Sequence, residues 1–211
     1  MGCLYAEQLH SSGCDITLVM RTGTLQTALP VIIERDGTRS EQQLRIVTPE
    51  NHEPISRLLI ATKAYDVREA VASIAHLLSD DSVIVLLVNG MGLAEQLATD
   101  WPHLNIFCGT TTEGAYRLAP QHIQHTGRGE TRIGKQGLTQ PPAWFAHWAQ
   151  AIDACLWDSD IDTALWSKLA INCIINPLTA AHRCTNGALS QRQELAAQVT
   201  TLCNEVSQIT R

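Results

Sequence analysis

Short apolar runs alternate with segments of helical spacing over the first two thirds of the chain. Hydrophobic residues recur every three or four positions over residues 67–78, which predicts an amphipathic helix. The run 83–88 is apolar at every position, as is typical of a central parallel strand buried on both faces. Further strands are predicted over 15–21, 31–35, 44–47, 58–62 and 105–108, and further helices over 3–10 and 93–98. This alternation predicts an α/β fold with a doubly wound, parallel, Rossmann-like sheet.

Two local signals refine this pattern. Asp36-Gly37 between two apolar runs predicts a hairpin turn. After Pro141-Pro142 the spacing becomes helical, with helices predicted over 144–154, 160–176 and 194–209 and no strand pattern among them. We therefore expect two domains, an α/β domain over residues 1–140 and an all-helical domain over residues 141–211.

Composition and charge exclude several classes of protein. Hydrophobic residues make up 45% of the 211 residues, enough for an ordinary core. Lys and Arg total 15 against 21 Asp and Glu, so the net charge of −6 argues against binding nucleic acid or an anionic membrane through bulk charge. The longest apolar run has six residues, far short of the roughly 18 or more of a membrane helix. We expect neither nucleic acid nor a membrane as a partner.

The cysteines and the start of the sequence point to the cytoplasm. The seven cysteines are odd in number, irregularly spaced and without a CxxC pair, so a disulfide framework or zinc cluster is not expected. Residues 1–7 lack the basic and long apolar segments of a signal peptide. His122 and His125 form an HxxH pattern, but in a strand they would face opposite sides, so we expect no metal site.

The most informative segment is the predicted helix 160–176 and the residues after it. Lys168, Asn172 and Asn176 recur at every fourth position and form one polar stripe on an otherwise apolar helix. Buried polar groups need partners or a wet cleft, which favours a binding site. A lysine that snorkels, with asparagines bonded to nearby backbone, explains the same spacing equally well. Pro177 predicts that the helix kinks or ends there.

Four motifs in order carry a resemblance to a known family. They are the run WSKLAINCIINPLTA over 166–180 with Cys184-Thr185-Asn186-Gly187, the loop Thr62-Lys63-Ala64-Tyr65, the loop Val88-Asn89-Gly90-Met91-Gly92, and the turn Gly109-Thr110-Thr111-Thr112-Glu113-Gly114-Ala115. This set resembles the ketopantoate reductase (2-dehydropantoate 2-reductase) family over nearly the whole chain. The resemblance implies NADPH-dependent reduction of ketopantoate to pantoate in pantothenate biosynthesis, in the cytoplasm. It also implies a small 2-ketoacid as the substrate, and homo-oligomer formation stays open.

The resemblance assigns roles to individual residues. Lys168 matches the general acid, which would protonate the carbonyl oxygen as hydride reaches the carbon. Asn172, Asn176 and Asn186 match substrate-binding asparagines, whose amides suit a hydroxyl and a carboxylate. Positions that match contacts to the cofactor are Gly2, Arg21, Lys63, Asn89 and Gly114.

The cofactor choice also follows from charge. In a dinucleotide fold the end of the second strand meets the adenosine ribose, where a carboxylate favours NAD and a cation accommodates the 2′-phosphate of NADP. The strand here ends at Arg21, and no carboxylate occurs between Ile16 and Glu34. Family position and phosphate chemistry therefore agree on NADP(H), although a surface arginine at a strand end is also common.

The resemblance departs from the family at both ends. Gly2 matches the third glycine of the family's GxGxxG turn, so we expect the first strand of the sheet to be missing. The family continues beyond the match to Arg211 through helices that carry a substrate-binding serine and a glutamate, so we expect a partial helical domain. Three alternatives stay open: an inactive homologue or nucleotide-binding subunit, a reductase of another branched 2-ketoacid, and an interaction module using the surface around Trp144 and Trp148.

Overall fold

The computed structural model describes residues 1–209, which form two compact units that divide after Ile161. The first unit is α/β and the second is helical, so the predicted fold class is confirmed. The predicted division at residue 140, into a cofactor-binding α/β domain and a helical substrate domain, stays a prediction. Each unit is described by itself below.

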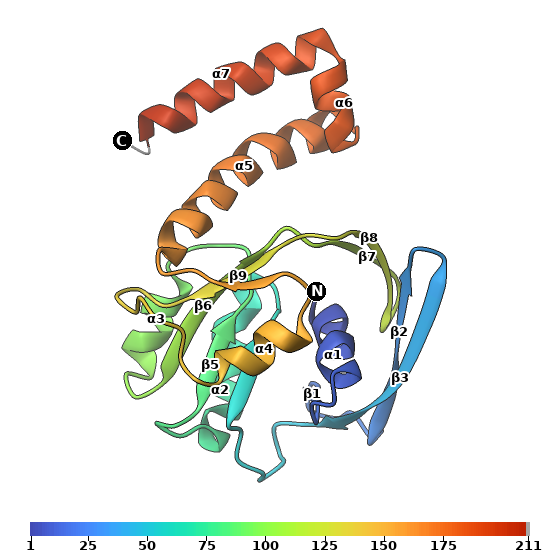
Figure 1. Ribbon diagram of the computed structural model, residues 1–211, viewed down its shortest axis with the longest axis vertical. Helices are drawn as coiled ribbons and strands as arrows, with labels where there is room; N and C mark the ends of the chain where they lie inside the picture. The colour runs from blue at the N-terminus through green and yellow to red at the C-terminus, as the bar shows by residue number, and fades with distance from the viewer. Residues whose placement is uncertain (210–211) are drawn as a thin grey trace. The chain divides into compact units, whose positions relative to one another are not determined.

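Two five-stranded sheets form the first unit (Figure 1). In the first sheet the strands lie in the order β1 (Thr17–Val19), β3 (Thr38–Val47), β2 (Ala28–Arg35), β8 (His122–Gly127) and β7 (Gly114–Ala119). In the second sheet the order is β10 (Cys155–Trp157), β9 (Thr131–Gly134), β6 (Asn105–Thr111), β5 (Val83–Leu86) and β4 (Arg57–Ile60).

Both sheets mix parallel and antiparallel pairs, so the predicted parallel pairing holds for only part of each sheet. β4, β5 and β6 are parallel neighbours, but β2–β3, β6–β9 and β7–β8 are antiparallel. The predicted hairpin turn explains one of these pairs. Asp36 and Gly37 both have positive φ, 52° and 76°, as a two-residue hairpin turn requires, and so short a connection permits only antiparallel pairing.

Three helices pack on the second sheet, and one lies between the two sheets. The helices of the first unit are α1 (Gly2–Ser11), α2 (Val67–Ile74), α3 (Leu93–Asp100) and α4 (Phe145–Ala151), with short 3₁₀ turns η1 (Ala64–Asp66) and η2 (Ala75–Leu77). The predicted helix over 67–78 is thus confirmed for its first two turns.

The strand β5 is buried at every position, as its uniformly apolar sequence predicts. Val83 and Val85 pack with Phe107 and the α4 side chains in one core, whereas Ile84 and Leu86 pack with α2 and α3 in another. Successive side chains of a strand point to opposite faces, so helices on both faces require apolar residues throughout.

Helix α1 lies between the two sheets and is buried over six consecutive residues (Figure 1). Leu4 packs in the core of the first sheet, and Tyr5 and Leu9 pack in the core that the second sheet shares with α4. Tyr5 also forms a 2.7 Å hydrogen bond between its hydroxyl and Oγ1 of Thr131, which ties α1 to β9. Helix α1 therefore contributes to both cores.

The segment after residue 140 begins inside the first unit. Phe145, Trp148 and Cys155 are buried in the core with β5 and β6. Cys155–Trp157 forms β10, which pairs in parallel with β9, so the prediction that no strand follows residue 140 is wrong. Burial of Trp148 also removes one of the two side chains on which the interaction-module alternative rested.

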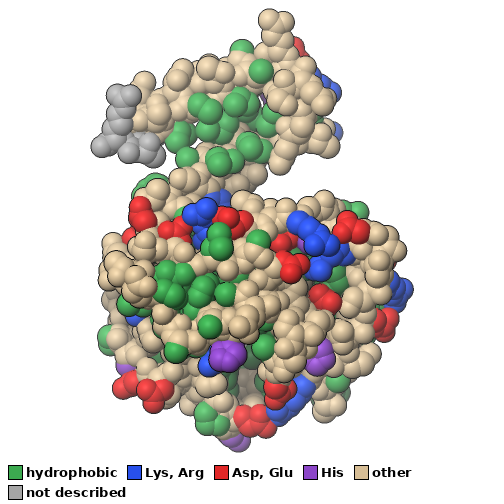
Figure 2. Space-filling view, viewed as in Figure 1, with side chains coloured by type: hydrophobic (Ala, Val, Ile, Leu, Met, Phe, Trp, Pro, Cys, Tyr) green, Lys and Arg blue, Asp and Glu red, His purple; other side chains and the backbone are tan. Residues whose placement is uncertain are grey.

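Three helices form the second unit: α5 (Ile161–His182), α6 (Asn186–Gln191) and α7 (Gln193–Ile209). Ile174, Leu178, Leu189 and Leu195 form its core, and Figure 2 shows hydrophobic side chains gathered in this unit. Helix α5 continues through Pro177 to His182, so of the two predicted alternatives the helix end is wrong, and the kink stays a prediction. The proline removes one helical hydrogen bond, but burial of the flanking Ile174 and Leu178 holds the helix together. No helix within residues 1–209 is long and apolar enough to span a bilayer.

Candidate functional site

Three of the predicted cofactor residues lie just beyond the carboxyl ends of parallel strands. Arg21 follows β1, Lys63 follows β4, and Asn89 follows β5. Ile60 is paired with Leu86 at the ends of β4 and β5, so the loops with Lys63 and Asn89 leave the sheet at the same edge. Open α/β sheets bind their ligands at this edge.

Close packing of two glycines against alanine side chains brings three segments together here. A Cβ added to Gly90 would lie 3.5 Å from the Cβ of Ala64, so the loops after β4 and β5 are in contact. A Cβ added to Gly2 would lie 3.7 Å from the Cβ of Ala61, which places the N-terminus of α1 at the same edge. A helix N-terminus offers unpaired N–H groups and a partial positive charge, which suit a pyrophosphate. Gly2, Lys63, Asn89 and Gly90 thus belong to one region of the surface.

Arg21 lies at the end of the first sheet. Its side chain is exposed, and its carbonyl accepts a 2.9 Å hydrogen bond from the Thr24 hydroxyl, which closes a tight turn. An exposed guanidinium at a strand end can form bidentate hydrogen bonds to a phosphate.

Gly114 begins β7, and close packing against β8 explains why this position is a glycine. A Cβ added there would lie 3.0 Å from Oγ1 of Thr126 and 3.3 Å from the amide nitrogen of Gly127. A larger residue would therefore disturb the β7–β8 pairing. The role of Gly114 in binding a cofactor stays a prediction.

A buried polar network supports the turn before Gly114. The Glu113 carboxylate is hydrogen-bonded to Nε2 of His125, and both side chains are at least 97% buried. Arg35 donates from Nε to Nδ1 of His125 over 2.8 Å, so the His125 proton lies on Nε2 and is donated to Glu113. The Arg35 guanidinium lies 3.9 Å from the Glu7 carboxylate, which also accepts a 2.9 Å hydrogen bond from Ser40. This network links α1, β2 and β8 to the β6–β7 turn.

The predicted substrate residues lie in the second unit. Lys168, Asn172 and Asn176 lie along α5 at every fourth position, which places them on one side of the helix. Lys168 and Asn172 are partly buried and Asn176 is exposed. Burial lowers the pKa of the Lys168 ammonium. Asn186 is the first residue of α6 and is exposed.

The first unit thus carries every predicted cofactor residue and the second unit every predicted catalytic and substrate residue. Their roles stay predictions. Chemically, the first unit offers cations and helix N–H groups for phosphates, and the second offers an ammonium and amides for an oxyanion and a carboxylate.

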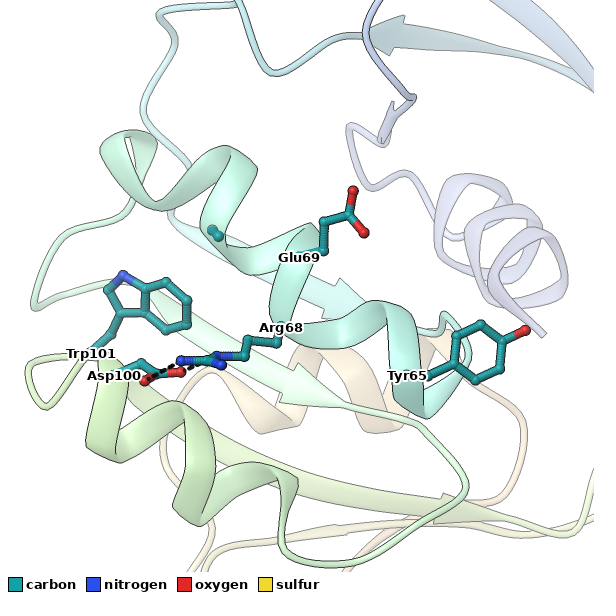
Figure 3. Close-up of a pocket in the computed structure, with 6 residues that line it drawn as sticks. Tyr65, Arg68, Glu69, Asp100 and Trp101 are labelled. Carbon is teal, nitrogen blue, oxygen red and sulfur yellow. Dashed lines mark hydrogen bonds and ion pairs between the residues drawn. The ribbon is translucent and has the colours of Figure 1, made fainter.

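A shallow cavity of about 630 Å³ opens near the Lys63 loop, on the side of α2 and α3 (Figure 3). Its lining residues are Tyr65, Arg68, Glu69, Ala72, Asp100 and Trp101. Arg68 donates two hydrogen bonds to the Asp100 carboxylate, at 2.7 and 3.0 Å, so its charge is already paired. Tyr65 is 82% exposed. The sequence did not predict this cavity, because its only local sign is the aromatic ring of Tyr65 in a polar loop.

The histidine pair of the sequence is separated by its partners. His122 Nε2 lies 2.8 Å from the Glu34 carboxylate, whereas His125 contacts Glu113 and Arg35. Within residues 1–209 no group of three His, Cys, Asp or Glu side chains is arranged to hold a metal ion.

Comparison with known families gives two matches that cover most of the chain. The family described as "Ketopantoate reductase PanE/ApbA" matches residues 1–137, and its C-terminal counterpart matches residues 160–211. The 2-dehydropantoate 2-reductase of Vibrio cholerae serotype O1 is 32% identical over 211 residues, covering 99% of this chain and 69% of that relative.

Solved structures share the fold. A 2-dehydropantoate 2-reductase from Geobacter metallireducens GS-15 superposes with a TM-score of 0.84 at 23% identity, over 97% of this chain and 70% of that one. A D-mandelate dehydrogenase with NADH and anilino(oxo)acetate superposes with a TM-score of 0.82 at 20% identity, over 100% of this chain and 70% of that one. At these identities the two likenesses show the arrangement of elements alone.

Proposed function

Because this chain belongs to the ketopantoate reductase family, we propose that it reduces 2-dehydropantoate to pantoate with NADPH, a step of pantothenate biosynthesis. The observation that carries the proposal is the stripe of Lys168, Asn172 and Asn176 on α5, inside the segment that matches the family's C-terminal model. A partly buried ammonium followed by two amides on one helix side is suited to a compact 2-ketoacid.

Lys168 is the proposed general acid. As the carbonyl carbon accepts hydride, the carbonyl oxygen gains negative charge, and the Lys168 ammonium donates its proton to that oxygen. Burial lowers the pKa of Lys168, which makes proton donation easier than from an exposed lysine. Asn172, Asn176 and Asn186 hold the carboxylate and hydroxyl of the substrate through amide hydrogen bonds.

The first unit fits a dinucleotide. The N-terminus of α1 at Gly2 and the loop at Gly90 (φ 136°) are proposed to contact the pyrophosphate, through backbone N–H groups that a glycine leaves uncovered. Arg21 is proposed to contact the 2′-phosphate, and Lys63, Asn89 and Gly114 the remainder of the cofactor. Bound NADPH would supply the hydride. Residues 1–140 are accordingly the proposed cofactor domain and residues 141–211 the proposed substrate domain.

Two findings from the comparisons require that the activity assay also examine alternative cofactors, alternative substrates and a chain without turnover. The D-mandelate dehydrogenase holds NADH on the same fold, so NADH and other branched 2-ketoacids are assayed beside NADPH and ketopantoate. The chain spans 69% of the Vibrio cholerae relative, so a nucleotide-binding chain without turnover is a defined outcome. The seven free cysteines suit a reducing cytoplasm, where we place the reaction, and homo-oligomer formation stays a prediction.

The test is ketopantoate-dependent oxidation of NADPH by the purified 211-residue chain. Lys168→Ala is expected to reduce kcat by at least about 100-fold, the usual contribution of a general acid. Lys168→Arg keeps the positive charge but holds its proton too tightly, so it separates charge from proton donation. Unchanged turnover in Lys168→Ala would refute the acid role. A folded wild-type chain that binds NADPH without turnover would identify a non-catalytic homologue.

A further inference from the structure

The fold brings a carboxylate to the turn that begins at Arg21, although that stretch of the sequence contains none. β1 and β3 are parallel neighbours, with Val19 paired to Val47, and the Met20 amide donates a 2.8 Å hydrogen bond to the Val47 carbonyl. The segments that follow both strands therefore leave the sheet at the same edge. Thr22 lies three residues beyond Val19, and Glu50 lies three residues beyond Val47.

Side-chain contacts join the two segments. Hydrogen bonds from the Thr48 hydroxyl, from the Glu50 amide and from the Thr22 hydroxyl lower the pKa of the Glu50 carboxyl. Glu50 is therefore ionised at neutral pH and tied to the turn that begins at Arg21. That turn is itself closed by the Thr24 hydroxyl on the Arg21 carbonyl, at 2.9 Å.

We propose that Glu50 sets the preference of this chain between a 2′-hydroxyl and a 2′-phosphate on the adenosine ribose. Its carboxylate accepts a hydrogen bond from a ribose hydroxyl, but it repels a phosphate that Arg21 attracts. The inference rests on the proposed function, because it takes the nucleotide to lie at this edge of the sheet. Arg21 and Glu50 then act in opposite directions on the same group.

The exposure of these residues to solvent sets how strongly Glu50 can change the nucleotide preference. Arg21, Thr22 and Glu50 are all exposed, so water and salt screen the repulsion between Glu50 and a phosphate. We expect removal of the Glu50 charge to shift the preference toward the 2′-phosphate by about threefold to tenfold at low salt, and by less at high salt.

The experiment measures binding and does not depend on turnover. The Kd values of 2′,5′-ADP and 5′-AMP, which differ only at the 2′ position, are measured by calorimetry for the full chain and for Glu50→Gln. Glu41→Gln is the matched control, since it removes the same charge from an exposed position on β3. The expected result is a Kd ratio, 2′,5′-ADP over 5′-AMP, that falls threefold to tenfold in Glu50→Gln and stays unchanged in Glu41→Gln.

The other outcomes are distinct. If both nucleotides bind and the ratio is the same in Glu50→Gln as in the wild-type chain, the inference is overturned and the proposed cofactor site stands. An equal shift in Glu41→Gln would show a general charge effect and would overturn it too. If neither nucleotide binds the wild-type chain, the proposed function and the role of Glu50 both fail.

Discussion

A lysine serves as an acid only while it holds its proton, and burial at Lys168 weakens that hold. The pKa of Lys168 lies below its ordinary value of 10.5 because the ammonium is partly desolvated. We expect kcat to fall as pH rises through this lowered pKa, since the deprotonated amine has no proton to donate. The pH profile of kcat for ketopantoate reduction measures this limb. A profile that stays flat up to pH 10.5 would contradict it.

The same shift has a consequence for stability. The folded state holds the Lys168 proton less tightly than the unfolded chain, so the free energy of unfolding rises with pH between the lowered pKa and 10.5. Below the lowered pKa the charged lysine opposes folding by a constant amount. Urea titrations of the wild-type chain and of Lys168→Met, which carries no titratable group there, separate this contribution from that of other residues.

Cysteine reactivity should divide by burial. Burial raises the pKa of the Cys155 thiol to about 12, so almost no thiolate is present at pH 8. Cys173 and Cys203 are exposed on α5 and α7. We expect iodoacetamide to label these two cysteines in the native protein long before Cys155, as mass spectrometry of peptides reports. In denaturant all three should react alike, and native labelling of Cys155 at a similar rate would show that its core opens readily.

At the scale of elements, the sequence predicts a helix or strand best where every residue of the segment packs in a uniform environment. β5 is apolar throughout because helices cover both of its faces, and α2 has clear helical spacing because one side packs on the sheet. β7 is mostly exposed and β10 has three residues, so neither produces a periodic pattern. β7 is held by its hairpin with β8, and β10 by pairing with β9, which lies well before it in the chain. Pairing of this kind does not depend on a periodic pattern in the strand's own sequence.

The two histidines of β8 provide a matched test of buried polar contacts. His125 and Glu113 are at least 97% buried, whereas His122 and its partner Glu34 are partly exposed. His125→Ala leaves Glu113 and Arg35 without their shared partner, so we expect a loss of about 3 kcal/mol in the free energy of unfolding. His122→Ala should cost about 1 kcal/mol or less. Urea unfolding measures both, and equal losses would mean that burial of the network is not the cause.

One glycine is required by close packing at the end of β9. A Cβ added to Gly134 would overlap the Asp158 carbonyl and lie 2.8 Å from the Cβ of Ile161. Gly134→Ala must therefore displace backbone, and we expect a loss of about 2 kcal/mol or more. Gly127, at the end of β8, has no atom within 4 Å of an added Cβ, so Gly127→Ala is the control. Thermal unfolding that lowers the Tm equally in both variants would contradict this account.

At the scale of the whole molecule, the sequence predicts where the motifs lie better than it predicts which distant residues contact them. The Lys63 and Asn89 loops were expected at the carboxyl ends of strands, and β4 and β5 place them there. The charge of Glu50 near the end of β1 could not be predicted from the sequence, because Glu50 follows β3. The two residues Thr22 and Glu50 meet only because β1 and β3 pair in parallel. The network from Glu7 to Glu113 was missed for the same reason, since it joins four separate elements.

The position of α1 also governs how the first unit comes apart. Its ten residues contribute side chains to the cores of both sheets, and Tyr5 and Glu7 hydrogen-bond in opposite directions, to β9 and to β3. Neither sheet can open without exposing α1, so the two sheets should melt together in a single cooperative transition. We therefore expect the slowest amide hydrogen exchange of this unit in α1. A helix of less than three turns, such as α1, would scarcely be stable alone in water.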